Sequence, residues 1–249
     1  MSEIGVIGGS GIYALEGIEF KKEHDVDTPY GKPSDKIIEA EINGVKVFFL
    51  PRHGREHSVL PHEVNYRANI FALKKLGVEY LISVSAVGSL KEELPPKTFV
   101  MPDNFIDWTK GSRERTFFGN GIVAHVSTAY PIDEKLRNII YNSCLENEID
   151  CSNGGSYICI EGPQFSSRAE SEIYRGFGAS IIGMTNVPES YLAKEAGIAY
   201  ATMAMVTDYD CWKEEHCAVD EILRVMKENN KNANKVLQTI IEYLSIIHI

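Results

Sequence analysis

The sequence lacks the clusters of basic side chains by which proteins bind nucleic acids. Its 249 residues carry 25 Lys and Arg against 35 Asp and Glu, which gives a net charge of −10. Affinity for a nucleic-acid backbone comes from clustered cationic side chains, so this balance argues against a nucleic-acid partner. A local site for a small anion stays compatible with it.

Long hydrophobic runs are also missing. The longest, 45–50 and 196–206, are too short to span a bilayer, so we expect no membrane association. The N-terminal residues carry neither a basic region nor a cleavage signal. We therefore expect a cytoplasmic protein.

Cysteine is sparse, and its spacing is uninformative. The chain has Cys144, Cys151, Cys159, Cys211 and Cys217, an odd number without any Cys-x-x-Cys pair. This pattern favours neither a disulfide framework nor a zinc site, so we expect reduced thiols and no metal. A pairing of Cys211 with Cys217 would be plausible only in a hyperthermophile.

What the sequence does contain is an alternation of short, β-branched apolar runs with helical patterns. The predicted strands are 4–7, 45–50, 80–84, 98–101, 156–160, 181–184 and 200–207. The predicted helices are 62–75, 134–147, 167–177, 188–196 and 220–246, the last with Asp220 as its N-cap. Such alternation predicts an α/β domain over 1–249, with a mixed, largely buried β-sheet flanked by helices. Residues 103–129 lack helical periodicity, and we interpret them as an excursion that contacts another subunit.

A glycine-rich segment, 8–11, follows the first predicted strand. Its amides and the Ser10 hydroxyl could cradle an anion, or the segment could be a purely structural turn. Residues 9–14 also satisfy the dinucleotide pattern G-x-G-x-x-A. That pattern must open a helix, whereas Gly17 and the polar stretch 21–36 interrupt this one, so we reject it.

Three further polar segments follow predicted strands. Arg52 and His53 come after 45–50 and form either an anion clamp or a pair of solvated surface charges. Residues 83–89 are small and leave room either for a ligand or for an ordinary turn. Thr185 follows 181–184. Ligands of α/β sheets gather at strand ends, so these segments together predict one shared site.

The run 199–206 ends in Thr207, Asp208, Tyr209 and Asp210. If the strand continues, Asp208 and Asp210 face the same side, because strand side chains alternate with a period of two. Burial and like charge would then raise their pKa values, and one carboxyl could remain protonated near neutrality. If the strand ends at Thr207, both are solvated turn residues.

With these segments assembled, the chain resembles the methylthioadenosine phosphorylases of the trimeric purine nucleoside phosphorylase family over nearly its whole length. The segments that carry the resemblance are 7–11, 28–35, 52–57, 64–70, 85–90, 160–170 and 207–212. The resemblance implies the purine nucleoside phosphorylase fold, partly barrel-like in its sheet, and a homotrimer or a hexamer of two trimers.

The same resemblance implies a transferase that splits S-methyl-5′-thioadenosine into adenine and 5-methylthioribose 1-phosphate, a step of purine and methionine salvage. No cofactor is implied, since inorganic phosphate is a co-substrate. One alternative is a broad purine nucleoside phosphorylase acting on adenosine, inosine or methylthioinosine. Another is a nucleotide-binding protein without turnover.

Site roles are also implied by the resemblance, position by position. The residues implied to hold phosphate are Ser10, Arg52, His53, Ser85, Ala86 and Thr185. Those implied to contact the nucleoside are Gly88, Phe165, Met184, Val206, Val219, Ile222, Leu223 and, from a neighbouring subunit, His125. Asp208, Asp210 and Ser166 would select and activate the purine, with Asp208 as proton donor to N7 and Asp210 as acceptor from the exocyclic amine.

Two departures from the family bear on the substrate and the site. Relatives that act on 6-oxopurines carry Glu at the position of Ser166 and Asn at that of Asp208, so this chain favours 6-aminopurines. Some family members have Asn where this chain has Gly183, which leaves one ribose or base contact unassigned.

Overall fold

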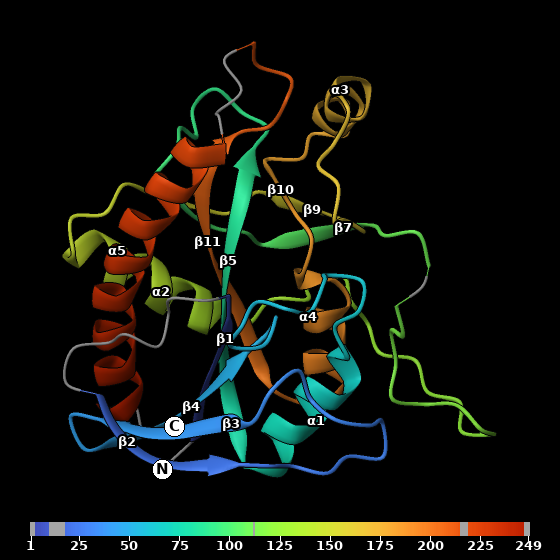
Figure 1. Cartoon of the computed structure of the whole chain (residues 1–249), viewed down its shortest axis with the longest axis vertical. Coiled ribbons are helices and arrows are strands. Elements are labelled where there is room, and N and C mark those ends of the chain that lie inside the picture. Colours follow the sequence, from blue (N-terminus) through green and yellow to red (C-terminus); the bar gives the residue numbers. More distant parts are fainter. Residues whose placement is uncertain (1–2, 10–17, 112, 215–218, 247–249) are drawn as a thin grey trace.

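The computed structural model describes residues 3–9, 18–111, 113–214 and 219–246 (Figure 1). In these residues one mixed sheet contains β1 (Glu3–Gly8), β2 (Ile18–His24), β3 (Ile37–Ile42), β4 (Val45–Pro51), β5 (Val78–Ser89), β6 (Phe99–Met101), β7 (Asn104–Trp108), β8 (Cys151–Asn153), β9 (Ser156–Ile160), β10 (Ile181–Gly183) and β11 (Ala199–Tyr209). The helices are α1 (Tyr66–Lys75), α2 (Glu134–Glu146), α3 (Arg168–Gly176), α4 (Asn186–Glu195) and α5 (Val219–Ile246).

The long strand β5 is where the sheet branches. It pairs in parallel with β1 through its first half and with β11 along most of its length, and antiparallel with β10 at Gly88 and Ser89. One path from β5 runs through β1 to β4, β3 and β2, another through β10 to β9 and β7, and a third through β11 to β6 and β8. The β1 branch therefore joins the first half of β5, and the β10 and β11 branches flank its last residues on either side.

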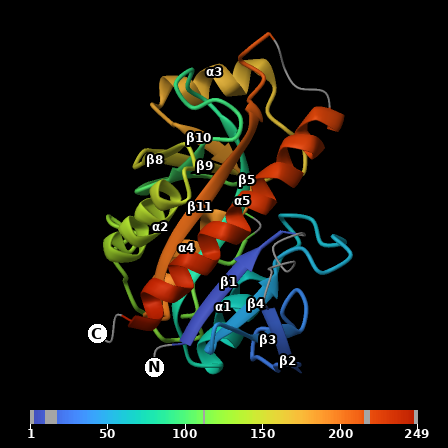
Figure 2. The same ribbon diagram turned by 90° about the vertical axis from the view of Figure 1, so that its left-hand side faces the viewer.

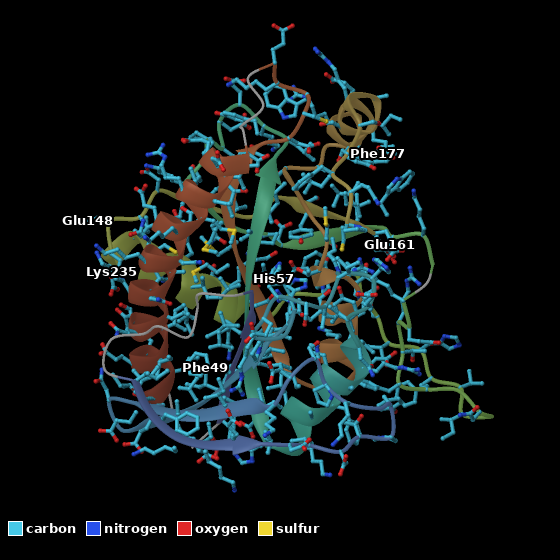
Figure 3. The ribbon with its side chains drawn as sticks, viewed as in Figure 1. Phe49, His57, Glu148, Glu161, Phe177 and Lys235 are labelled. Carbon is cyan, nitrogen blue, oxygen red and sulfur yellow. The ribbon has the colours of Figure 1, made fainter. Side chains whose placement is uncertain are left out.

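Helices cover the sheet on two sides, α2 and α5 on the left and α1 and α4 on the right of Figure 1. Figure 2 shows α5 running diagonally across β11. The inner face of α5 is apolar, with Val236, Leu237 and Ile240 wholly buried. Lys235 lies on its outer face, at the left edge of the molecule (Figure 3). The alternation of buried and exposed residues along α5 is the amphipathic pattern that predicted the helix.

The predicted α/β fold class is confirmed, and the structure corrects several boundaries. The segment 83–89, interpreted as lying at a strand end, is the second half of β5 itself. The last helix begins at Val219, so Asp220 lies in its first turn and is not its N-cap. Strands β2, β3, β7 and β8 were not predicted; β2 is an exposed edge strand with a mostly polar sequence, which gives no apolar signal.

The predicted excursion leaves the sheet after β7 and projects to the right in Figure 1. Residues 119–130 of it are exposed, among them the apolar Ile122, Val123 and Tyr130. Arg113 anchors its base, because it is buried and donates to the carbonyl oxygens of Met184 and Val187 at 2.7 and 2.8 Å. No helix within the described ranges is long and apolar enough to cross a membrane.

Candidate active site

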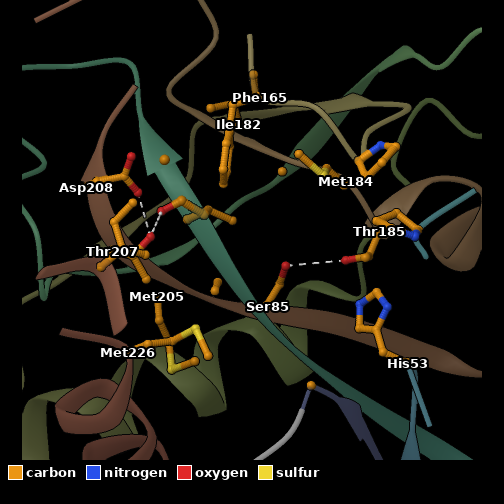
Figure 4. Close-up of a pocket in the computed structure, with 18 of the residues that line it drawn as sticks. His53, Ser85, Phe165, Ile182, Met184, Thr185, Met205, Thr207, Asp208 and Met226 are labelled. Carbon is orange, nitrogen blue, oxygen red and sulfur yellow. Dashed lines mark hydrogen bonds between the residues drawn. The ribbon is translucent and has the colours of Figure 1, made fainter. Parts of the chain in front are cut away.

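A cavity of about 440 Å³ opens among the ends of several strands and beside the first turns of α5 (Figure 4). Thirteen of the residues predicted for the site line this cavity: Arg52, His53, Ser85, Ala86, Gly88, Phe165, Ser166, Met184, Thr185, Asp208, Asp210, Ile222 and Leu223. The branching of the sheet at β5 explains the convergence, because each branch delivers its terminal residues to the same place.

One end of the cavity presents hydroxyl groups. Ser85 on β5 and Thr185 after β10 approach each other with their side-chain oxygens 3.4 Å apart (Figure 4). Both are buried, and the backbone of Ala86 and Gly9 lies alongside them. Hydroxyls and amides gathered at strand ends form a neutral concave set of donors that suits an anion.

Arg52 reaches this end, but its charge is already compensated. Arg52 is 1% exposed, and its Nε and Nη2 donate to the Glu189 carboxylate at 2.6 and 2.9 Å. Nη2 also donates to Ser83 Oγ at 2.7 Å, and Nη1 donates to the Val84 carbonyl at 3.3 Å. The guanidinium of the predicted anion clamp is thus bound to Glu189, and the described residues leave one Nη1 hydrogen of Arg52 for an anion.

His53 faces the same end as an uncharged ring. Burial, followed by the neighbouring Arg52 charge, lowers the pKa of His53 to about 4. Its Nδ1 lies 2.8 Å from the carbonyl oxygen of Val59, so Nδ1 carries the hydrogen and donates it there. Nε2 then presents a lone pair, which can accept a hydrogen bond from a protonated anion.

The other end of the cavity is acidic, and a β-bulge shapes it. Val206 pairs with Val87, whereas Asp208 pairs with the next residue, Gly88, so Thr207 is an extra residue in β11. The bulge interrupts the alternation of sides, and Thr207 and Asp208 both line the cavity. Val206 is wholly buried in the core and is not among the residues that line it, so its contact with the nucleoside stays a prediction.

Asp208 and Asp210 both face this acidic end, which decides between the two interpretations of the strand terminus. The pKa of Asp208 is raised to about 6, mainly by burial. A hydrogen bond of 2.7 Å from the Thr207 hydroxyl opposes this rise in part, and the charge of Asp210 adds to it. Burial likewise raises the pKa of Asp210. Among the described residues Asp210 Oδ2 and Ser166 Oγ are buried and form no hydrogen bond, so both atoms can bond a polar group of a ligand.

Local structure fixes the loop that carries Ser166. Ser167 is the N-cap of α3, where its hydroxyl accepts from the Glu170 amide at 3.3 Å and the Glu170 carboxylate accepts from the Ser167 amide at 2.8 Å. This reciprocal capping box was legible in the sequence as Ser-x-x-Glu. Phe165, two residues before the cap, stays 72% exposed at the mouth of the cavity.

Some predicted site residues are not brought to the cavity. His125 is exposed on the projecting segment 119–130 and does not line it. Ser10 and the side chain of Val219 lie outside the described residues.

Sequence reasoning missed Glu189, which holds Arg52. Its signal was a carboxylate within a helix whose neighbours Val187, Leu192 and Ala193 are all buried. A buried charge of this kind requires a partner. Also missed were Met205 and Met226, which line the apolar wall beside Ile222.

Comparisons with known proteins agree with this geometry. Residues 3–242 match the family model of the phosphorylase superfamily. The chain is 54% identical to the S-methyl-5′-thioadenosine phosphorylase of Hyperthermus butylicus over 98% of its own length and 89% of that protein's.

Comparison with solved structures gives the same family. The crystal structure of a methylthioadenosine phosphorylase from an antarctic soil metagenomic library superposes with a TM-score of 0.95 at 49% identity, covering 99% of this chain and 87% of that one. The Schistosoma mansoni methylthioadenosine phosphorylase in complex with adenine gives 0.93 at 38% identity, covering 99% and 93%. The chain belongs to the phosphorylase superfamily and, within it, to the methylthioadenosine phosphorylases.

Proposed function

We propose that this protein is a phosphorylase that converts S-methyl-5′-thioadenosine and inorganic phosphate into adenine and 5-methylthioribose 1-phosphate. The observation that carries the proposal is the polarity of one cavity, with neutral anion-binding donors at one end and two carboxyls at the other. A nucleoside placed between them has its base against the acids and its sugar against the hydroxyls.

The reaction follows from that placement. The bond between C1′ and N9 breaks with its electron pair passing to the purine, while the ribose gains positive charge. Asp208 gives its proton to N7, which becomes more basic as the base departs, and phosphate forms the new bond to C1′. Ser85, Ala86 and Thr185 hold the phosphate, with Arg52 and His53 completing its site.

Base selectivity belongs to the acidic end. Asp210 accepts from the exocyclic amine, and its buried Oδ2 has no other partner among the described residues. A 6-oxo group would place a second acceptor there, and Ser166 is too short to offer a compensating contact. Unmatched buried polar groups of this kind cost on the order of 1–3 kcal/mol each.

An apolar wall of Met205, Ile222, Leu223 and Met226 is suited to the 5′-methylthio group. The family resemblance alone assigns Val219 to the methylthio group and Ser10 to the phosphate. In a homotrimer, or a hexamer of two trimers, His125 of the exposed segment 119–130 approaches the 5′ group of the neighbouring subunit. The enzyme acts as one domain in the cytoplasm, without metal or cofactor.

The test is a phosphate-dependent assay of adenine release. Methylthioadenosine, adenosine and inosine are compared by kcat/KM, with phosphate omitted as the control. We expect methylthioadenosine to give the highest value and turnover to require phosphate. Equal or greater kcat/KM for inosine would favour the broad purine nucleoside phosphorylase instead. Binding of methylthioadenosine without release would leave only the nucleotide-binding protein.

A further inference from the structure

Gly183 ends β10 immediately before two site residues, Met184 and Thr185. A Cβ atom at this position would lie 2.0 Å from the hydroxyl oxygen of Tyr157 and 2.6 Å from its Cζ. Tyr157 lies on the adjacent strand β9, where it pairs with Ile181 and is wholly buried. The tyrosine therefore occupies the space that any side chain at position 183 would need.

The hydroxyl of Tyr157 ends beside the two hydroxyls of the anion-binding end. It lies 3.5 Å from Ser85 Oγ, which in turn is 3.4 Å from Thr185 Oγ1, the contact dashed in Figure 4. Burial raises the pKa of Tyr157 to about 12, so the hydroxyl keeps its proton at physiological pH. The Tyr157 hydroxyl thus lies behind Ser85, which lines the cavity together with Thr185.

Counting hydrogens shows what the third hydroxyl adds. Each hydroxyl has one hydrogen to donate and can accept as well. When Ser85 Oγ accepts from Tyr157, the hydrogen of Ser85 can point either to Thr185 Oγ1 or into the cavity, and an anion bound there attracts it into the cavity. This orientation matters here because Arg52 is compensated by Glu189 and His53 presents a lone pair, so neutral donors carry much of the hold on an anion.

We propose that Tyr157 is a positioning residue for phosphate: its hydroxyl fills the space left by Gly183 and turns the Ser85 hydroxyl toward the bound anion. The inference rests on the proposed function. It also accounts for the glycine that stands where some family members have asparagine. Here the polar group comes from the neighbouring strand in place of a side chain at position 183.

The first test is Tyr157→Phe, which removes one oxygen and keeps the ring. We expect the KM for phosphate to rise about three- to tenfold, the value of one hydrogen bond, with the KM for methylthioadenosine nearly unchanged. Tyr30→Phe is the matched control, because it removes a partly buried hydroxyl that donates to the Phe117 carbonyl away from the cavity. An unchanged KM for phosphate, or an equal rise in both KM values, would overturn the proposal.

Calorimetric titration of inorganic phosphate into the free protein gives a readout that needs no turnover. If the wild-type protein binds phosphate but releases no adenine, the proposed function fails while the role of Tyr157 can still be tested. A Tyr157→Phe protein that binds phosphate as tightly as wild type overturns the role of Tyr157 alone.

A double-mutant cycle tests the shared space. Gly183→Ala should destabilise the wild-type protein strongly, because its Cβ collides with the tyrosine. In a Tyr157→Val background the ring is gone, and the same substitution should cost much less of the free energy of unfolding, as read from urea denaturation. Additive effects would show that the two positions do not compete, which contradicts the inference.

Discussion

The two ends of the cavity solve opposite electrostatic problems. At the anion-binding end, the guanidinium of Arg52 is held by the buried carboxylate of Glu189, and the remaining donors are neutral. At the acidic end, Asp208 and Asp210 lie close together with no cation paired to either among the described residues, and burial raises the pKa of both. At the anion-binding end the charge of Arg52 is neutralised by Glu189, whereas at the acidic end the raised pKa keeps part of Asp208 protonated near neutrality.

This difference fits the chemistry of the two ends. A phosphate held by preorganised hydroxyls and amides can be bound without an excess of positive charge, so the sugar phosphate can leave again. A carboxyl in an apolar setting with a pKa near 6 keeps part of its population protonated near neutrality and can supply that proton to a leaving base. Substitutions at either end of the cavity test this difference.

The largest effect is expected from Asp208→Asn at the acidic end. The amide cannot give its proton to N7, so kcat/KM for methylthioadenosine should fall by about 10²–10⁴-fold. Turnover of inosine should be unchanged or faster. The Asn amide still donates a hydrogen bond to N7, although it transfers no proton, and it does not repel a 6-oxo group as an ionised Asp does. The comparison is made by steady-state kinetics with both nucleosides, and an equal loss on both in a folded protein would remove the base-selecting role.

At the anion-binding end, Arg52→Ala should act first on stability. It leaves the carboxylate of Glu189 buried and unpaired, which typically costs about 3–5 kcal/mol of the free energy of unfolding. The KM for phosphate should rise as well, because the remaining Nη1 donor is lost. Urea denaturation measures the first effect. Adding Glu189→Gln to Arg52→Ala should recover part of the loss, and a single variant as stable as wild type would show that the pair is not charged.

The sequence allowed much of this site to be predicted, because the family motifs coincide with polar residues at or near the ends of predicted strands. Ser85, Thr185, Asp208 and Asp210 all reach one cavity as expected. The position of Val206 in the core could not be predicted in this way, since period-two alternation cannot anticipate a bulge that lets Thr207 and Asp208 share a side.

Other features depend on contacts between distant segments and therefore left no local signal. The pairing of Arg52 with Glu189 joins residues 137 positions apart, and the fit of Tyr157 against Gly183 joins two strands. In the fold, β2 can be recognised as a strand only from its antiparallel pairing with β3, because its sequence is mostly polar and exposed. Apolar patterns predict burial, but they do not predict which polar side chains will be buried together.

The bulge can be tested by two truncations on either side of the cavity wall. Val206→Ala should cost about 2 kcal/mol of stability and leave both KM values unchanged, because the side chain is in the core. Leu223→Ala, at a side chain that is 55% exposed, should leave stability within about 0.5 kcal/mol. It should raise the KM for methylthioadenosine more than that for adenosine. A kinetic effect from Val206→Ala would place Val206 back at the ligand.

The smallest effect is a pH dependence that only the acidic end should show. The pKa of Asp208 is about 6 in the folded protein against an ordinary value of 3.8, so the folded state holds this proton more tightly than the unfolded state. Its contribution to stability is fully present below about pH 3.8 and is lost as the pH rises through 6. Asp208 keeps some contact with solvent, so the loss should be on the order of 1 kcal/mol.

Urea denaturation of wild type and Asp208→Asn at several pH values between about 4 and 8 measures this loss of stability. The difference between the two proteins should shift against wild type as the pH rises, because the amide introduced by Asp208→Asn does not titrate. A difference that stays constant over this range would mean that Asp208 is ionised throughout. The acidic end would then hold no proton near neutrality for transfer to the base.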